Sequence, residues 1–329
     1  MKGKGLRLIC LGAIISAVIA AGCFLLTGCK KDDGLKGADV SVPSESNTYH
    51  TREEAVAAGG GWYETMIEDF DSNTLPEKWN YSPHGLRNTE YWCDQTVSFE
   101  DGCLVVDAYR SDSHSCDVCP SSGEFTGGIE TRYMDGEESV QTFSQAFGYY
   151  EVRCKLPRAQ GMWAAFWLQS VNQGKIGNEG EDGTEIDVFE SAFINKNPAM
   201  VGHALLYDGY ADYGKVTDFR KVTDSDLYDG FHTYGLKWTP NEYIFYVDGK
   251  ATWRTDFGGV SKVPEFLRLT CEIRHGYGPH GVKLKEFDST EENPAKFYVD
   301  YVKVYQNTEY EASIKSDSDY KEIIPEGGK

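Results

Sequence analysis

The sequence predicts an all-β protein in which many short antiparallel strands form a sandwich or a barrel. Aromatic residues, which favour strands, make up 13% of the 329 residues. Short segments of alternating large and polar residues are separated by turn pairs such as Asp101-Gly102 and Asp248-Gly249. No long segment repeats its apolar residues at the helical period.

The N-terminus is expected to be a signal for export. Basic residues precede an apolar run over residues 8–26. Leu26-Thr27-Gly28-Cys29 resembles the lipobox of bacterial lipoproteins, which implies cleavage before Cys29 and a lipid on that cysteine. Because the run is near the lower limit for crossing a bilayer, an uncleaved anchor is the alternative. Both interpretations place the remaining chain outside the cytoplasm, anchored to the membrane at the bacterial cell surface.

The composition divides the chain into four parts. Residues 1–28 are the expected signal, and residues 29–61 are rich in Ser, Asp, Gly, Glu and Ala, which predicts a flexible linker. A short helix is possible within the linker, over residues 51–58. One domain is expected over residues 62–306, and a loose polar tail over residues 307–329.

Strands are predicted along the whole domain. Thr239-Pro240-Asn241-Glu242 and Asp248-Gly249 provide turn chemistry for a three-strand meander. The predicted strands cover residues 104–109, 147–156, 233–238, 243–247, 250–253 and 297–305.

The charge and composition limit the partners. The formal net charge is -20, whereas nucleic-acid binding needs clustered Lys and Arg, so no nucleic-acid partner is expected. The acidic field suits a neutral substrate better than a polyanion. Aromatic side chains also offer flat faces on which sugar rings can stack. The protein is expected to be a monomer.

Six cysteines remain when the signal and Cys29 are set aside, and an even number outside the cytoplasm permits disulfides without fixing their pairing. Cys116 and Cys119 have the spacing of half a zinc site or of a redox pair. No second pair with this spacing follows, and His114 alone is weak support, so a local disulfide or free thiols is the preferred interpretation.

The most informative segment covers residues 183–191 and has the composition of a strand. Glu185 and Asp187 share one face by strict alternation, whereas Glu190 falls on the other. A β-bulge at Val188-Phe189 would return Glu190 to the face of the first two acids. Retaining glycoside hydrolysis needs two carboxyls this close together, one as nucleophile and one as acid. A solvated acidic face, or a calcium site that includes Asp182, is the alternative.

Residues 185–190 match the E-x-D-x-x-E signature of glycoside hydrolase family 16, in the form carried by its laminarinases, β-agarases and carrageenases. Lichenases of the family have E-x-D-x-E instead. Residues 147–153, 161–168 and 299–305 also resemble family strands. The resemblance implies a jelly-roll β-sandwich of two antiparallel sheets with a concave substrate groove. It implies that Glu185 is the nucleophile and Glu190 the acid/base, with Asp187 between them.

Further residues are expected around these acids. Trp163 and Trp167 share a strand face and suit a sugar platform. His203 resembles a family histidine that contacts the sugar, although a satisfied core histidine is equally open. Glu272 stands where many laminarinases lack an acid. The resemblance also implies a distal subsite wall of Arg87, Glu90 and Trp92, and a structural calcium on the Gly102 carbonyl and the Asp300 carboxylate.

These observations predict a membrane-anchored, retaining endo-glycoside hydrolase with a polysaccharide substrate. The first choice is β-1,3- or mixed β-1,3/1,4-glucan, and no cofactor is expected in catalysis beyond the possible structural calcium. A galactan hydrolase of the agarase type or a glycan transglycosylase is the alternative. A non-catalytic sugar-binding lipoprotein would have lost an essential carboxyl, and all three are present.

Overall fold

The computed structural model describes residue 35 and residues 38–323. The expected signal, the predicted lipid site Cys29 and the end of the tail lie outside these residues. No helix within the described residues is long and apolar enough to cross a membrane.

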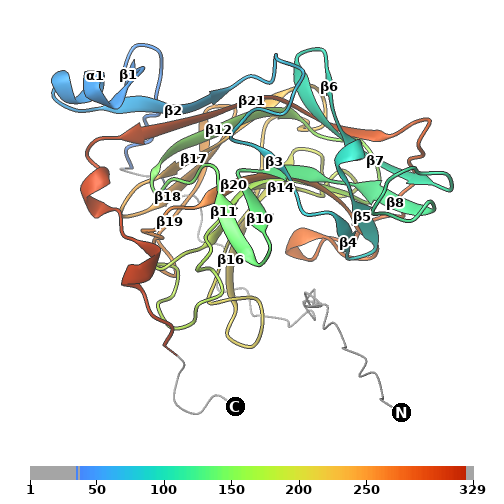
Figure 1. The fold of residues 1–329 in the computed structure, drawn as a ribbon. Coiled ribbons are helices and arrows are strands. Elements are labelled where there is room, and N and C mark those ends of the chain that lie inside the picture. Colours follow the sequence, from blue (N-terminus) through green and yellow to red (C-terminus); the bar gives the residue numbers. More distant parts are fainter. Residues whose placement is uncertain (1–34, 36–37, 324–329) are drawn as a thin grey trace, which may run out of the picture.

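The described residues form a β-sandwich, which confirms the predicted fold class (Figure 1). The larger sheet has the order β19-β18-β17-β12-β21-β7-β8-β5-β4, with β2 also beside β21, β1 beside β2 and β6 beside β7. Its strands are β1 (Thr48–Tyr49), β2 (Trp62–Glu68), β4 (Gly85–Arg87), β5 (Glu90–Trp92), β6 (Val97–Glu100), β7 (Cys103–Ser111), β8 (Gly123–Thr126), β12 (Gly148–Lys155), β17 (His232–Trp238), β18 (Tyr243–Val247), β19 (Lys250–Thr255) and β21 (Ala295–Asn307).

The second sheet has the order β16-β15-β14-β13-β20-β9-β3, and every pair in it is antiparallel. Its strands are β3 (Asn80–Tyr81), β9 (Gly128–Glu130), β13 (Met162–Gln169), β14 (Glu185–Ser191), β15 (Met200–Tyr207), β16 (Lys215–Val222) and β20 (Phe266–Ile273). The remaining elements are the hairpin β10 (Arg132–Asp135) and β11 (Glu138–Gln141), the helix α1 (Arg52–Ala57), and the short 3-10 turns Asp94–Thr96, Pro279–Gly281, Glu311–Ser313 and Asp317–Asp319.

The core lies between the two sheets. Phe189 of β14 packs against Tyr234 of β17, with ring centroids 4.2 Å apart, and against Phe297 of β21 at 6.4 Å. All three side chains are fully buried. The predicted turn pairs are confirmed, because Asp248 and Gly249 have φ of 49° and 69° and join β18 to β19. Positive φ at both central residues gives the tight hairpin turn whose twist matches that of the strands.

Both ends of the described chain pack on the sandwich, which corrects the expected flexible linker and loose tail. Nζ of Lys237 binds the Asp39 carboxylate at 3.0 Å and the Ser41 carbonyl at 2.9 Å. Near the C-terminus, the amide of Ile323 donates to the Ile176 carbonyl at 2.6 Å. Lys237 is 2% exposed, so its ammonium needs the oxygen partners that the polar residues Asp39 and Ser41 supply. The expected short helix is present as α1, capped by the Thr51 side chain.

Candidate active site

The carboxylate strand β14 contains the β-bulge that the sequence predicts. Asp187 faces Ala204 and Glu190 faces Gly202 on β15, so three steps along β14 match two along β15. Val188 is the extra residue, because its two neighbours face consecutive residues of β13. The bulge therefore turns a mixed strand into one with all its acids on the same side. We call this side of the sheet the carboxylate face, and its acids are Glu185, Asp187 and Glu190.

His203 is a core histidine, so the predicted sugar contact is wrong. Its side chain is fully buried on the opposite side of β15 from the carboxylate face. Burial lowers the pKa of His203 to about 3, so the ring is neutral, and Nδ1 lies 2.7 Å from the Val188 carbonyl. Nε2 lies 3.0 Å from the Thr252 hydroxyl. A bulge takes backbone groups out of the ladder, and His203 supplies a partner to the carbonyl of the bulged residue.

Glu185 lies at the start of β14 among groups that favour its charged form. The Tyr210 hydroxyl donates to its carboxylate, and Nε2 of Gln169 donates at 3.2 Å. Burial nevertheless raises the pKa of Glu185 to about 7, assisted by the charge of Glu190 and opposed by Tyr210 and Arg268. The carboxyl is therefore close to half ionised at neutral pH, and small changes around it decide its charge.

Asp187 sits between the other two acids and is 5% exposed. Burial, followed by the charges of Glu190 and Glu185, raises the pKa of Asp187 well above its ordinary value. Asp187 therefore holds its proton to higher pH than an ordinary aspartate does, which reduces the charge that this side of the sheet must carry.

Glu190 is held by a histidine that the sequence did not single out as a site residue. Nε2 of His280 lies 2.9 Å from the Glu190 carboxylate, and Nδ1 lies 2.9 Å from the Asp218 carboxylate. Burial lowers the pKa of His280, but the hydrogen bonds to Asp218 and Glu190 outweigh this and raise it to about 9. The imidazole is thus a cation at neutral pH, placed between two carboxylates.

The two tryptophans occupy the carboxylate face, as their spacing predicts, but they differ in exposure. Trp167 is 6% exposed, donates to the Thr270 hydroxyl at 3.0 Å, and has the Arg268 guanidinium 4.0 Å from its ring centroid. Trp163 is half-buried, with Arg274 at 4.8 Å from its ring. Trp163 is therefore the ring with more surface available for stacking on a sugar.

The residues predicted as a subsite wall do gather beside Glu272. Nε of Arg87 lies 2.9 Å from the Glu272 carboxylate, and its guanidinium lies 4.4 Å from the Trp92 ring. Glu90 is fully buried, and burial, followed by the charge of Glu272, raises its pKa to about 7. Trp92 is 2% exposed. Glu90 and Trp92 therefore lie in the protein interior beside Arg87 and do not face a ligand.

The two predicted calcium ligands lie near each other, because β7 pairs with β21 close to both. Nη1 of Arg153 lies 2.5 Å from the Asp300 carboxylate. Calcium takes 6–8 oxygen ligands, and one carboxylate already paired with an arginine is a poor start for such a set. Calcium binding stays a prediction.

Several residues of the carboxylate face come from segments far from β14 in the sequence. Arg268 has pKa lowered to about 10 by burial and pairs with Glu130 at 2.8 Å. The sequence signal that could have found Tyr210 and His280 is their place in short segments rich in aromatic residues, Tyr207-Asp208-Gly209-Tyr210 and Tyr277-Gly278-Pro279-His280. The remaining residues that sequence reasoning missed are Gln169, Asp218, Thr270 and Arg274.

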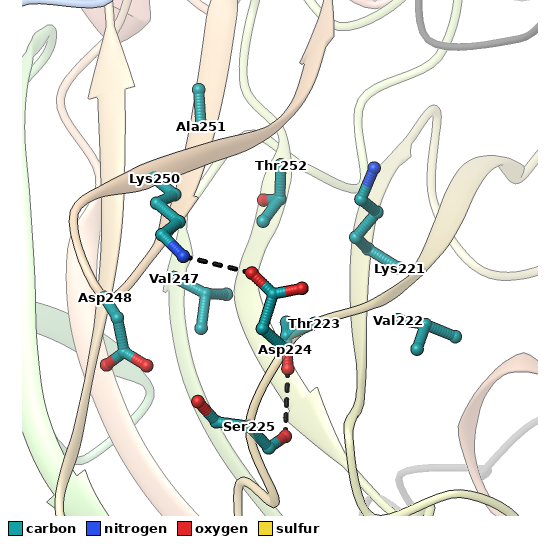
Figure 2. Close-up of a pocket in the computed structure, with 10 residues that line it drawn as sticks. All are labelled: Lys221, Val222, Thr223, Asp224, Ser225, Val247, Asp248, Lys250, Ala251 and Thr252. Atoms are coloured by element: carbon teal, nitrogen blue, oxygen red, sulfur yellow. Dashed lines mark hydrogen bonds and ion pairs between the residues drawn. The ribbon is translucent and has the colours of Figure 1, made fainter.

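A pocket of about 260 Å³ lies elsewhere, between the end of β16 and the β18–β19 hairpin (Figure 2). Lys250 crosses it to pair with Asp224 at 3.0 Å. None of its lining residues belongs to the carboxylate face. This pocket is therefore separate from the carboxylate face.

Closely spaced carboxyls in a row on one strand are the arrangement that retaining glycoside hydrolysis uses. The model of Glycosyl hydrolases family 16 matches residues 92–260, just over half of the chain, so the chain belongs to this family.

Known proteins resemble the chain over most of the sandwich. Endo-1,3-1,4-beta-glycanase EglC of Rhizobium meliloti (strain 1021) is 28% identical over 63% of this chain and 39% of that protein. Keratan-sulfate endo-1,4-beta-galactosidase of Sphingobacterium multivorum is 24% identical over 87% of this chain and 66% of that protein. The catalytic domain of a laminarinase from Thermotoga petrophila RKU-1 has a TM-score of 0.58 and 24% identity, over 76% of this chain and 99% of that chain. The chain spans about two fifths of the length of EglC.

Proposed function

We propose that the protein is a retaining endo-glycoside hydrolase that cleaves β-1,3- or mixed β-1,3/1,4-glucan by double displacement. The observation that carries the proposal is the bulge at Val188, because it brings Glu190 to the face of Glu185 and Asp187. A strand whose acids only faced solvent would have no need of the bulge. EglC, an endo-1,3-1,4-beta-glycanase by name, supports the choice of linkages, and the Thermotoga laminarinase, an endo-1,3-beta-glucanase by name, supports the choice of glucan.

In the proposed reaction Glu185 attacks the anomeric carbon while Glu190 gives its proton to the leaving oxygen. A covalent glycosyl-enzyme forms and the glycosidic bond breaks. Glu190, now ionised, then takes a proton from water, and the water oxygen displaces Glu185. The His280 cation beside Glu190 stabilises the ionised form, which is the form that the second step needs.

A galactan hydrolase is the second candidate, because the Sphingobacterium galactosidase resembles the chain over most of its length. A sulfated galactan would require cations free to bind sulfate. Arg87 and Arg274 both pair with Glu272, and Arg268 pairs with Glu130. Since these guanidiniums already have carboxylate partners, the carboxylate face suits a neutral glycan better.

The cellular location belongs to the same proposal. Export through the N-terminal signal and a lipid on Cys29 would hold the enzyme at the bacterial surface, where polysaccharides are met. Palmitate labelling of wild type and of Cys29→Ala tests the anchor. Label on both proteins, or on neither, would contradict it.

The substrate is tested by digesting laminarin, lichenan, agarose, carrageenan and keratan sulfate and resolving the products by mass. Glucan oligosaccharides of several lengths are expected from the first two, and products that carry an added sugar acceptor would instead indicate transglycosylation. Glu185→Gln should remove turnover and leave glycan binding intact. A glucan bound but not cut by the wild type would mean a binding protein.

The mechanism is tested on Glu190→Ala. Azide needs no general base, so it should restore part of the lost activity and give a β-glycosyl azide. Proton NMR of the wild-type reaction should show the β anomer first. Initial appearance of the α anomer would contradict double displacement.

A further inference from the structure

A cluster of four side chains comes from the residue after β5 and from the segment between β7 and β8, and these three strands lie side by side at one end of the sandwich (Figure 1). Its members are Cys93, His114, Cys116 and Cys119. One potential ligand atom from each lies within 4.8 Å of all the others. The six cysteines of the described part form no disulfide, so these three sulfurs are available.

We propose that this cluster is a structural zinc site with three cysteine ligands and one histidine ligand. In a tetrahedral site with bonds of about 2.3 Å to sulfur and 2.0–2.1 Å to nitrogen, neighbouring ligand atoms lie roughly 3.5–3.8 Å apart. Sγ of Cys93 and Nε2 of His114 are 3.4 Å apart. This pair is already at the spacing that zinc imposes, and all four ligand atoms lie within 4.8 Å of one another. Soft thiolates with an imidazole select zinc over calcium or magnesium.

The histidine is oriented as a metal ligand is. With Nε2 directed at the sulfurs, the other ring nitrogen, Nδ1, lies 3.1 Å from the Tyr109 hydroxyl. Such an outer partner fixes the tautomer and the ring direction of metal-binding histidines. The ring also stacks on Phe125, with centroids 3.8 Å apart and planes at 24°. His114 therefore cannot turn away from the cluster without losing both contacts.

The cysteines are also preset. The Val118 amide lies 3.5 Å from Sγ of Cys116, and hydrogen bonds to sulfur favour the thiolate that binds metal. The Cys93 backbone is held by its amide, which donates to the Thr126 carbonyl at 3.1 Å. Cys93 and His114 are buried, whereas Cys116 and Cys119 are half-buried, which leaves a side for metal entry. Four protein ligands leave no open position for substrate, so the metal is structural.

The zinc site would hold the predicted subsite wall of Arg87, Glu90 and Trp92 in place. His114, Cys116 and Cys119 lie in the irregular segment between β7 and β8, whereas Cys93 directly follows β5. Strand β5 also carries Trp92, on which Arg87 stacks. A zinc ion would thus tie the loop to the short β4–β5 hairpin that places Arg87 against Glu272. This inference does not depend on the proposed reaction.

The test is the metal content of the purified full chain. The protein is purified from cells grown with zinc and is dialysed exhaustively. Inductively coupled plasma mass spectrometry should then find about one zinc ion per chain. Replacement by Co²⁺ should give the visible bands of a tetrahedral thiolate complex. A metal-free chain, with peptide mapping that finds a disulfide among Cys93, Cys116 and Cys119, would overturn the proposal.

Variants separate a built site from casual binding. Cys119→Ser should lose the zinc, whereas Cys119→His, which keeps a ligand atom, should retain it with weaker affinity. Cys103→Ser changes a cysteine outside the cluster and should keep the full zinc content. If Cys93→Ser does not fold, the wild-type stoichiometry and the Cys119 pair still decide the question. Unchanged zinc in Cys119→Ser would refute the assignment.

Discussion

The contact between Gly202 and His280 depends on the absence of a side chain. A Cβ atom on Gly202 would lie 2.1 Å from Nε2 of His280, the atom that faces Glu190. His280 itself has a φ of 53°, a conformation that few residues with side chains adopt. Such strain persists where surrounding contacts maintain it, and here Asp218 and Glu190 do so.

Gly202→Ala should therefore move His280 and lower kcat/KM by about 10- to 100-fold, as small displacements at an active site do. The pH profile should change as well, because the cation beside Glu190 moves. Gly174→Ala is the matched control, since a Cβ there meets nothing within 4 Å. Equal activity of both variants would mean that His280 does not position Glu190.

The raised pKa of Glu185 predicts a cost in stability. A carboxyl with a folded pKa of about 7 against an ordinary value of 4.5 binds more protons when folded, so the free energy of unfolding falls between these two pH values. Glu185→Gln removes this dependence. Its Tm should equal that of the wild type near pH 4 and exceed it by a few degrees above pH 7. Thermal melts of both proteins across this pH range measure the difference in Tm. A higher Tm of Glu185→Gln confined to acidic pH would contradict the raised pKa of Glu185.

Among the secondary-structure elements, strand β14 decides the chemistry, because it contains the bulge. One inserted residue reverses which side of the sheet every later side chain faces. Val188 and Phe189 are both fully buried, so the extra residue still contributes to the core. His203 binds the carbonyl of Val188, and the bulge is thus built into the packing of β15 as well.

Deletion of Val188 should keep the carboxyl row, because the shortened strand alternates regularly and Glu190 returns to the same side. The free energy of unfolding should fall by about 1–3 kcal/mol, since a buried valine and the partner of His203 are lost. Measurable glycan cleavage should remain. Insertion of an alanine after Phe189 is the matched variant, which should turn Glu190 inward and abolish activity. Activity in the insertion variant and none in the deletion variant would contradict the register.

At the scale of the whole molecule, the segment before the first long strand belongs to the sandwich. Lys237 is 2% exposed, and Asp39 and Ser41 supply its oxygen partners. The Tyr246 hydroxyl donates to the Val40 carbonyl at 3.3 Å. The segment therefore covers the outer side of the larger sheet and neutralises a buried cation.

Deletion of residues 38–47 should lower the Tm by a few degrees, because Lys237 loses its partners and apolar surface is exposed. Lys237→Met in the deleted chain should recover part of the loss, since it removes the uncompensated charge. Calorimetry compares the three proteins. A Tm unchanged by the deletion is the result expected of a free linker and would contradict the docked arrangement.

Local pattern was enough to predict the sandwich, most strand positions and the acids of β14. Alternation, turn pairs and the place of the bulge all depend on neighbours in sequence. The side of the strand that Glu190 faces follows from counting residues, so it was within reach without coordinates.

Contacts between distant segments were not within reach. The position of His203 in the core, the approach of His280 to Glu190, and the meeting of Cys93 with His114, Cys116 and Cys119 all join residues far apart in the chain. The strands and the acids on them follow from local periodicity, which can be read from the order of the residues. The side chains that surround each acid and each sulfur follow from how the strands are ordered in the two sheets, which no local pattern contains.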